Sequence, residues 1–177
     1  RSLPVFGPAP LGKPRAITPY WQTWRISAFQ PAAGNLATLG YPGDLASWPL
    51  TPRTFTEAFS SLRPEIAARG AQDEVVYYVG RLCCSEAMRL ALILGYDGPV
   101  KAWVDGREVF HDPDGRNPAT PSKGSGRFTA AAGEHEIVIA LGTNKGAAWG
   151  VFARLERLDV AAKAVRMGTY TLPEIRV

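Results

Sequence analysis

Residue types that often carry chemistry are scarce in this sequence. Its 177 residues include two cysteines, Cys83 and Cys84, and two histidines, His111 and His135. Adjacent cysteines do not have the spacing of a metal motif, and the histidines lack an HxxxH pattern. We therefore expect no zinc site and no other cofactor. Because neighbouring strand residues point to opposite faces, we expect two free thiols, one in the core and one outside.

Long apolar runs and runs of like charge are also absent. No stretch approaches the roughly 18 apolar residues of a membrane span, so we expect no membrane partner. The 20 Lys and Arg residues outnumber the 16 Asp and Glu residues and give a net charge of +4. That charge is scattered, whereas most nucleic-acid binders gather it in a patch or stripe. We expect no nucleic-acid partner, although mild basicity also suits an anionic polysaccharide.

The sequence shows no catalytic motif. Gly124-Ser125-Gly126 lacks the strand-to-helix elbow that exposes a serine nucleophile, and no phosphate-binding glycine loop precedes a helix. The acidic residues mostly fit turns or strand edges, whereas glycoside hydrolysis needs two carboxylates across a cleft. The chain is therefore expected not to be an enzyme.

Proline content divides the chain, which has a length typical of one domain. Ten of the 15 prolines fall in the first 64 residues. Since proline removes a hydrogen bond from a strand ladder, we expect residues 1–72 to form an irregular, wrapping arm with a first strand. The arm contains two strand-like pieces, Trp21–Phe29 and the weaker Asn35–Leu39. We also expect one short helix within residues 54–69, capped by Thr54.

From residue 73 the pattern becomes that of a sheet. Apolar side chains alternate with period two in Met88–Leu94 and again in Val100–Val104. Asp105-Gly106 then gives a strong hairpin signal. We expect residues 73–158 to form the main β-sandwich and residues 159–177 a C-terminal extension. Short strands without intervening helices predict an all-β, antiparallel sandwich.

Three segments carry a resemblance to a known family. Leu94–Gly98 (LGYDG) is a strand end that runs into a small-residue and Asp loop. Val100–Gly106 (VKAWVDG) joins an aromatic strand to a hairpin, and Ala148–Leu155 (AWGVFARL) places Trp-Gly before an aromatic and Arg-Leu. Over residues 74–158 the chain resembles the galactose-binding-like jelly-roll domains, which are carbohydrate-binding-module-like accessory domains of secreted bacterial carbohydrate-active enzymes.

The resemblance implies a jelly roll with at most one short helix, secreted or extracytoplasmic, within a larger protein. It implies a non-catalytic carbohydrate-binding module that targets its parent catalytic domain to a polysaccharide or oligosaccharide. The same shell also occurs without a sugar site, so the alternative is a structural or protein-interaction domain. No acidic cluster supports a structural calcium ion. Arg1 is not a natural start, and we expect an excised or processed piece.

Two loops have the composition of a sugar site. A sugar packs its apolar face on an aromatic ring, and its hydroxyls bond to polar side chains nearby. In a jelly roll, the strands through Leu94 and Leu141 can end side by side and bring both loops to one rim. The predicted ligand-binding residues are Tyr96, Asp97, Asn144, Lys145 and Trp149. Asp97 also fits a plain turn, and we expect its replacement by alanine to leave folding nearly intact.

Four further residues are secondary candidates for ligand contact: Trp21, Trp24, Trp48 and Arg116. Trp21 and Trp24 are three positions apart, so a regular strand would place one in the core and expose the other. Trp48 lies in a proline-bounded loop, where its ring fits either of two roles: a platform on which a ligand stacks, or a side chain that fills a gap in the fold. Arg116 lies in the polar loop that follows the hairpin.

Overall fold

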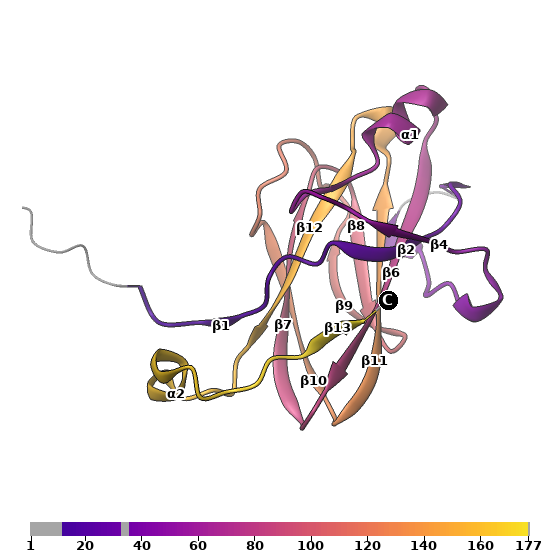
Figure 1. The fold of residues 1–177 in the computed structure, drawn as a ribbon. Coiled ribbons are helices and arrows are strands. Elements are labelled where there is room, and N and C mark those ends of the chain that lie inside the picture. Colours follow the sequence, from indigo (N-terminus) through magenta and orange to yellow (C-terminus); the bar gives the residue numbers. More distant parts are fainter. Residues whose placement is uncertain (1–11, 33–35, 177) are drawn as a thin grey trace, which may run out of the picture.

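Two antiparallel sheets face each other in the computed structural model, which describes residues 12–32 and 36–176 (Figure 1). In the five-stranded sheet the order is β1 (Ala16–Ile17), β12 (Gly150–Arg157), β7 (Met88–Tyr96) and β10 (Gly124–Ala130), with β5 (Ser60–Ser61) also paired to β12. In the eight-stranded sheet the order is β4 (Thr51–Thr54), β2 (Thr23–Ile26), β6 (Glu74–Cys84), β11 (Gly133–Gly142), β8 (Val100–Val104) and β9 (Arg107–Asp112), with β3 (Gln30–Pro31) and β13 (Glu174–Arg176) paired to β6. The predicted all-β, antiparallel sandwich is confirmed.

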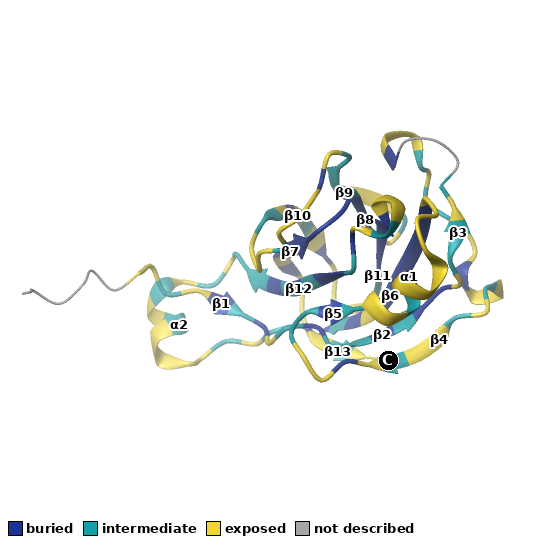
Figure 2. Cartoon of the chain, turned by 90° about the horizontal axis from the view of Figure 1, so that it is seen from above, coloured by how far each residue is buried: buried dark blue, intermediate teal, exposed yellow. Residues whose placement is uncertain are grey.

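The hydrophobic core lies between the sheets. Alternate side chains of β6 and β7, such as Val76, Tyr78 and Leu92, are fully buried there. Burying each apolar side chain of this size contributes about 1.5–3 kcal/mol. The opposite face of β6 is also covered, since Trp48 packs edge-on against Tyr77 with ring centroids 5.2 Å apart. Burial on both faces explains why β6 is apolar almost throughout (Figure 2).

The helices agree with the prediction in part, since a short helix does lie within residues 54–69. Thr54 does not cap a helix, because Thr51–Thr54 pair with β2 as strand β4. The helix begins later, as α1 (Arg63–Arg69), with Pro64 in the first turn, where its missing N–H removes no helical hydrogen bond. A second helix, α2 (Ala162–Met167), makes the expectation of at most one short helix wrong.

The described residues also form three 3₁₀ helices: η1 (Leu36–Thr38), η2 (Leu45–Ser47) and η3 (Asn144–Gly146). The first replaces the weak strand expected over Asn35–Leu39, of which Asn35 lies outside the described residues. None of the helices formed by the described residues is long and apolar enough to cross a membrane.

Trp21 and Trp24 are both buried, so the expectation that one would be exposed is wrong. Their rings stack with centroids 4.7 Å apart. Strand parity does not apply, because Trp21 precedes β2 and its backbone N–H donates to Ala153 O of β12 at 2.7 Å. The chain thus crosses from one sheet to the other between the two indoles. Gly80 makes room for them, since a Cβ there would lie 2.3 Å from the Trp21 ring.

The predicted hairpin and the predicted thiols are confirmed. Asp105 and Gly106 take the left-handed φ values of 49° and 78° that a tight turn between β8 and β9 requires. Cys83 and Cys84 are both free, with Cys84 buried in the core and Cys83 half-buried. The hairpin turn is tied to the sheet, because the Asp105 carboxylate contacts the His135 ring at 2.6 Å.

Candidate functional site

The fold brings the two predicted loops together at one rim of the sandwich. The first loop follows β7, which ends at Tyr96, and the second follows β11, which ends at Gly142. The Gly142 N–H donates to Pro99 O at 2.8 Å and joins the two loops directly. The five predicted residues divide into two that are buried here and three that reach the surface.

Asp97 is a buried hydrogen-bond acceptor between the loops. Its side chain is 1% exposed, and its Oδ1 accepts from the backbone N–H groups of Trp149 at 2.8 Å and Gly150 at 3.1 Å. Burial raises the pKa of Asp97, and these hydrogen bonds oppose that rise. The carboxylate therefore positions Trp149, and we now expect its loss to destabilise the fold, contrary to the expectation from sequence.

Tyr96 is also buried, which excludes it as a free stacking ring in this structure. Its hydroxyl donates to Asp112 Oδ2 at 2.7 Å, and the Lys123 ammonium lies 4.9 Å from its ring centroid. Burial, and after it the hydrogen bond to Asp112, raises the pKa of this phenol. Tyr96 supports the rim from within.

Trp149, Asn144 and Lys145 reach the surface. Trp149 is half-buried, its Nε1–H donates to Gly146 O at 3.2 Å, and the Arg63 guanidinium lies 4.2 Å from its ring centroid. Asn144 and Lys145 are exposed on η3, with left-handed φ values of 46° and 54°. The rim thus combines one fixed indole with an amide and two cations.

The secondary candidates lie apart from this rim or inside the fold. Trp21 and Trp24 are sealed in the core. Trp48 is half-buried against the outer face of the eight-stranded sheet. Arg116 is exposed in the loop after β9, and its carbonyl accepts from the Lys123 ammonium.

An aromatic cluster on the outer face of the five-stranded sheet was not anticipated. Tyr20, Phe59 and Phe152 are half-buried, and the Phe152 ring lies 5.8 Å from Tyr20 and 4.9 Å from Phe59. The Arg154 guanidinium lies 5.0 Å from the Tyr20 centroid. Strand parity could have found part of it, because Phe152 and Arg154 alternate with the core residues of β12.

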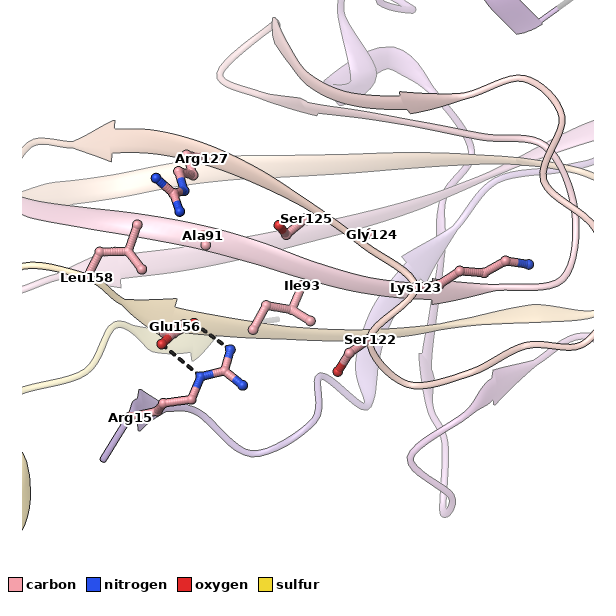
Figure 3. A pocket seen from close by; sticks show the side chains of 10 residues that line it. All are labelled: Arg15, Ala91, Ile93, Ser122, Lys123, Gly124, Ser125, Arg127, Glu156 and Leu158. Atoms are coloured by element: carbon pink, nitrogen blue, oxygen red, sulfur yellow. Dashed lines mark hydrogen bonds and ion pairs between the residues drawn. The ribbon is translucent and has the colours of Figure 1, made fainter. Parts of the chain in front are cut away.

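A shallow hollow of 410 Å³ lies on the same outer face (Figure 3). Its floor is formed by Ala91, Ile93 and Ser125, and Arg15 donates two hydrogen bonds, of 2.9 and 2.6 Å, to Glu156 at one side. This pairing lowers the pKa of Glu156. A smaller hollow of 200 Å³ shares Arg127 and Leu158 with it and is also lined by Arg89 and Thr129. We call the two together the outer trough.

The described residues lack the grouped side chains that a metal site requires. Within residues 12–32 and 36–176, no group of three or more His, Cys, Asp or Glu side chains is placed to hold a metal ion. His135, the histidine in closest contact with a carboxylate, bonds to Asp105 and to the carbonyl of Ala131. Burial would lower the pKa of His135, but these bonds raise it.

No protein-family model matches the sequence, and a search of curated proteins finds no match. Solved structures do resemble the fold. A β-glucosidase from Kluyveromyces marxianus is 9% identical with a TM-score of 0.52, and the match covers 82% of this chain and 17% of that enzyme. Its complex with glucose gives 10% identity and a TM-score of 0.51 over 83% and 16%. At these identities the likeness shows the fold alone, and this chain spans about one-sixth of the enzyme's length.

A lower-scoring match is a GH2 β-galacturonidase from Eisenbergiella tayi bound to glycerol. It is 12% identical with a TM-score of 0.47, over 82% of this chain and 24% of that one. A score below 0.5 supports no conclusion. The firm result is that this sandwich resembles a small portion of a much larger glycosidase.

Proposed function

We propose that this chain is a non-catalytic carbohydrate-binding domain that targets a larger carbohydrate-active enzyme to a polysaccharide. Trp149 carries the proposal, because it is an indole fixed at a rim beside exposed Asn144 and Lys145. An aromatic face with convergent polar groups is the usual composition of a sugar site. The resemblance in sequence to secreted accessory domains supports a parent catalytic domain as partner and a place outside the cytoplasm.

The geometry around Trp149 supports a pre-organised site. Asp97 fixes its backbone, Gly146 O fixes its Nε1–H, and the Arg63 guanidinium covers its ring. A side chain that is already held loses little conformational entropy when a ligand binds. The indole is therefore held in one orientation before a ligand binds, with one face already covered by Arg63.

The exposed surface argues against the alternative, a protein-interaction domain. Such a domain typically displays a contiguous apolar patch. Across the described part of the chain, Met167 is the one large hydrophobic side chain that is exposed, at 63%, and the aromatic cluster of Tyr20, Phe59 and Phe152 is half-buried. A lone exposed methionine on α2 does not form a docking patch.

Affinity electrophoresis through gels that contain neutral polysaccharides tests the proposal. Removing a central aromatic anchor typically costs about 2 kcal/mol of binding, or roughly thirtyfold in affinity, so Trp149→Ala should lose most retardation. Trp149→Phe retains more of the packing and should weaken retardation while the far-ultraviolet circular dichroism stays that of the wild type. Lys145→Gln should weaken it as well.

Lys163→Gln is the matched control, since Lys163 is an exposed cation on α2, away from the rim. It should be retarded like the wild type. The proposal fails if folded Trp149 and Lys145 variants bind as strongly as the control. If the unmutated chain is retarded by no polysaccharide in a broad panel, the structural alternative replaces it.

A further inference from the structure

The outer trough has the shape to hold an extended chain. Across the sheet, Ala91 of β7 lies between Glu156 of β12 and Arg127 of β10. A small side chain between two long ones leaves a hollow along the strands. The lining runs from residue 123, just before β10, along that strand to residue 129, a length of about 20 Å at about 3.3 Å per residue.

The charge of the trough is positive and partly unpaired. Glu156, the one carboxylate in the lining of these two hollows, is already neutralised by Arg15. Asp105 and Glu108 line a third hollow, which also borders Arg127. The Lys123 ammonium donates to the carbonyls of Tyr96 and Pro118 and points away from Arg127 (Figure 3).

Two other cations remain for a ligand. Arg89 and Arg127 are exposed and line the trough. Within residues 12–32 and 36–176, neither guanidinium has a hydrogen-bond or ion-pair partner. A guanidinium fork matches the geometry of a carboxylate.

The other residues that line the trough favour a sugar as the molecule that bears the carboxylate. Ser125 and Thr129 offer hydroxyl groups inside the trough. At the other end of the trough, the Ser122 hydroxyl accepts a hydrogen bond from Arg154 at 3.1 Å. The Arg154 guanidinium in turn lies 5.0 Å from the centroid of the Tyr20 ring in the aromatic cluster. Carboxylates, hydroxyls and apolar ring faces occur together in an acidic polysaccharide. We propose that the outer trough binds a uronate-containing polysaccharide, whose carboxylates pair with Arg127 and Arg89.

This second site adds to the proposed function and uses none of the rim residues. Polygalacturonate is the probe, and its fully methyl-esterified form is the neutral control with the same backbone. Isothermal titration should show binding of the acidic polymer, much weaker binding of the ester, and a loss of affinity as ionic strength rises above about 0.15 M.

A matched pair of variants locates the site. A hydrogen bond to a charged group contributes about 1.5 kcal/mol or more, so Arg127→Gln should weaken polygalacturonate binding about tenfold, and adding Arg89→Gln should weaken it further. Arg81→Gln removes the same charge from an exposed position on β6, in the other sheet. That control should bind within about twofold of the wild type.

The inference is overturned if Arg127→Gln and Arg81→Gln bind alike, or if the ester binds as tightly as the acid. Equal binding of poly-glutamate would also overturn it, because the surface would then recognise any polyanion. Trp149→Ala should retain polygalacturonate binding, whereas Arg127→Gln should retain binding of neutral polysaccharides at the rim. The two variants therefore distinguish failure of the trough from failure of the rim.

Discussion

Replacing Asp97 by alanine should destabilise the domain, because one carboxylate joins the two rim loops. Its Oδ1 accepts from the backbone N–H groups of Trp149 and Gly150, and the side chain is 1% exposed. Alanine leaves both donors without this acceptor in a site with little access to water. Asp97→Asn is the matched control, since its amide retains an oxygen at the same position.

The size of the effect follows from the two lost partners. An unsatisfied buried donor costs about 1–3 kcal/mol. Part of that cost is offset because alanine also removes a carboxylate whose burial raises its pKa. We expect Asp97→Ala to lose about 2–4 kcal/mol of the free energy of unfolding, a large part of the roughly 5–15 kcal/mol typical of a domain. Asp97→Asn should lie within about 1 kcal/mol of the wild type.

Urea denaturation followed by circular dichroism measures both variants, and its pH dependence adds a second readout. Since the folded-state pKa of Asp97 is raised, the folded protein holds that proton more tightly than the unfolded chain. This contribution to stability is lost as the pH rises from the unfolded value of about 3.9 through the folded value. Asp97→Asn does not titrate, so its stability should rise relative to the wild type across that window.

Two results would refute this account of the rim. One is an Asp97→Ala variant as stable as the wild type, which would mean that the two N–H groups find other partners. The other is an Asp97→Asn variant as unstable as the alanine variant. In that case the negative charge, and not the acceptor oxygen, would hold the loops together.

Three further predictions concern the sandwich itself. Burial lowers the pKa of His135, but its hydrogen bonds outweigh burial and raise that pKa. The protonated ring therefore stabilises the fold at pH values below the unfolded-state pKa of about 6.5, and this stabilisation is lost as the pH rises through the folded-state pKa. The gap in unfolding free energy between wild type and His135→Gln should therefore close with rising pH, and a constant gap would contradict this. A thiol reagent should modify half-buried Cys83 in the native protein and buried Cys84 only after unfolding; equal native rates would contradict the burial pattern. Gly80→Ala should lower the melting temperature by several degrees, equivalent to about 1–3 kcal/mol, because its Cβ would meet the Trp21 indole at 2.3 Å, and an unchanged melting temperature would exclude this clash.

The predicted rim shows where sequence reasoning stops. The two loops were correctly predicted to lie together, although β7 and β11 belong to opposite sheets and only the packing of the two sheets brings their ends to one rim. The sequence did not distinguish Tyr96, which is buried on Asp112, from Trp149, which reaches the surface. Both are aromatic residues near a strand end, and their exposure depends on what packs over them. Asp97 likewise fitted a turn or a ligand contact, and only its distance to the Trp149 N–H assigned it to the scaffold.

The local pattern of this sequence determined its long strands, its hairpin and the facing of its two cysteines. Period-two alternation and the Asp105-Gly106 turn depend on neighbouring residues alone, so they can be read along the chain. Long-range pairing decided the rest: Thr54, expected to cap a helix, became the last residue of β4 because Thr51–Thr54 found a partner in β2. The outer trough is a still clearer case, because Ala91, Glu156 and Arg127 come from three strands and become neighbours only through register. A hollow made by three distant residues is a property of the assembled sheet, and no single segment of the sequence contains it.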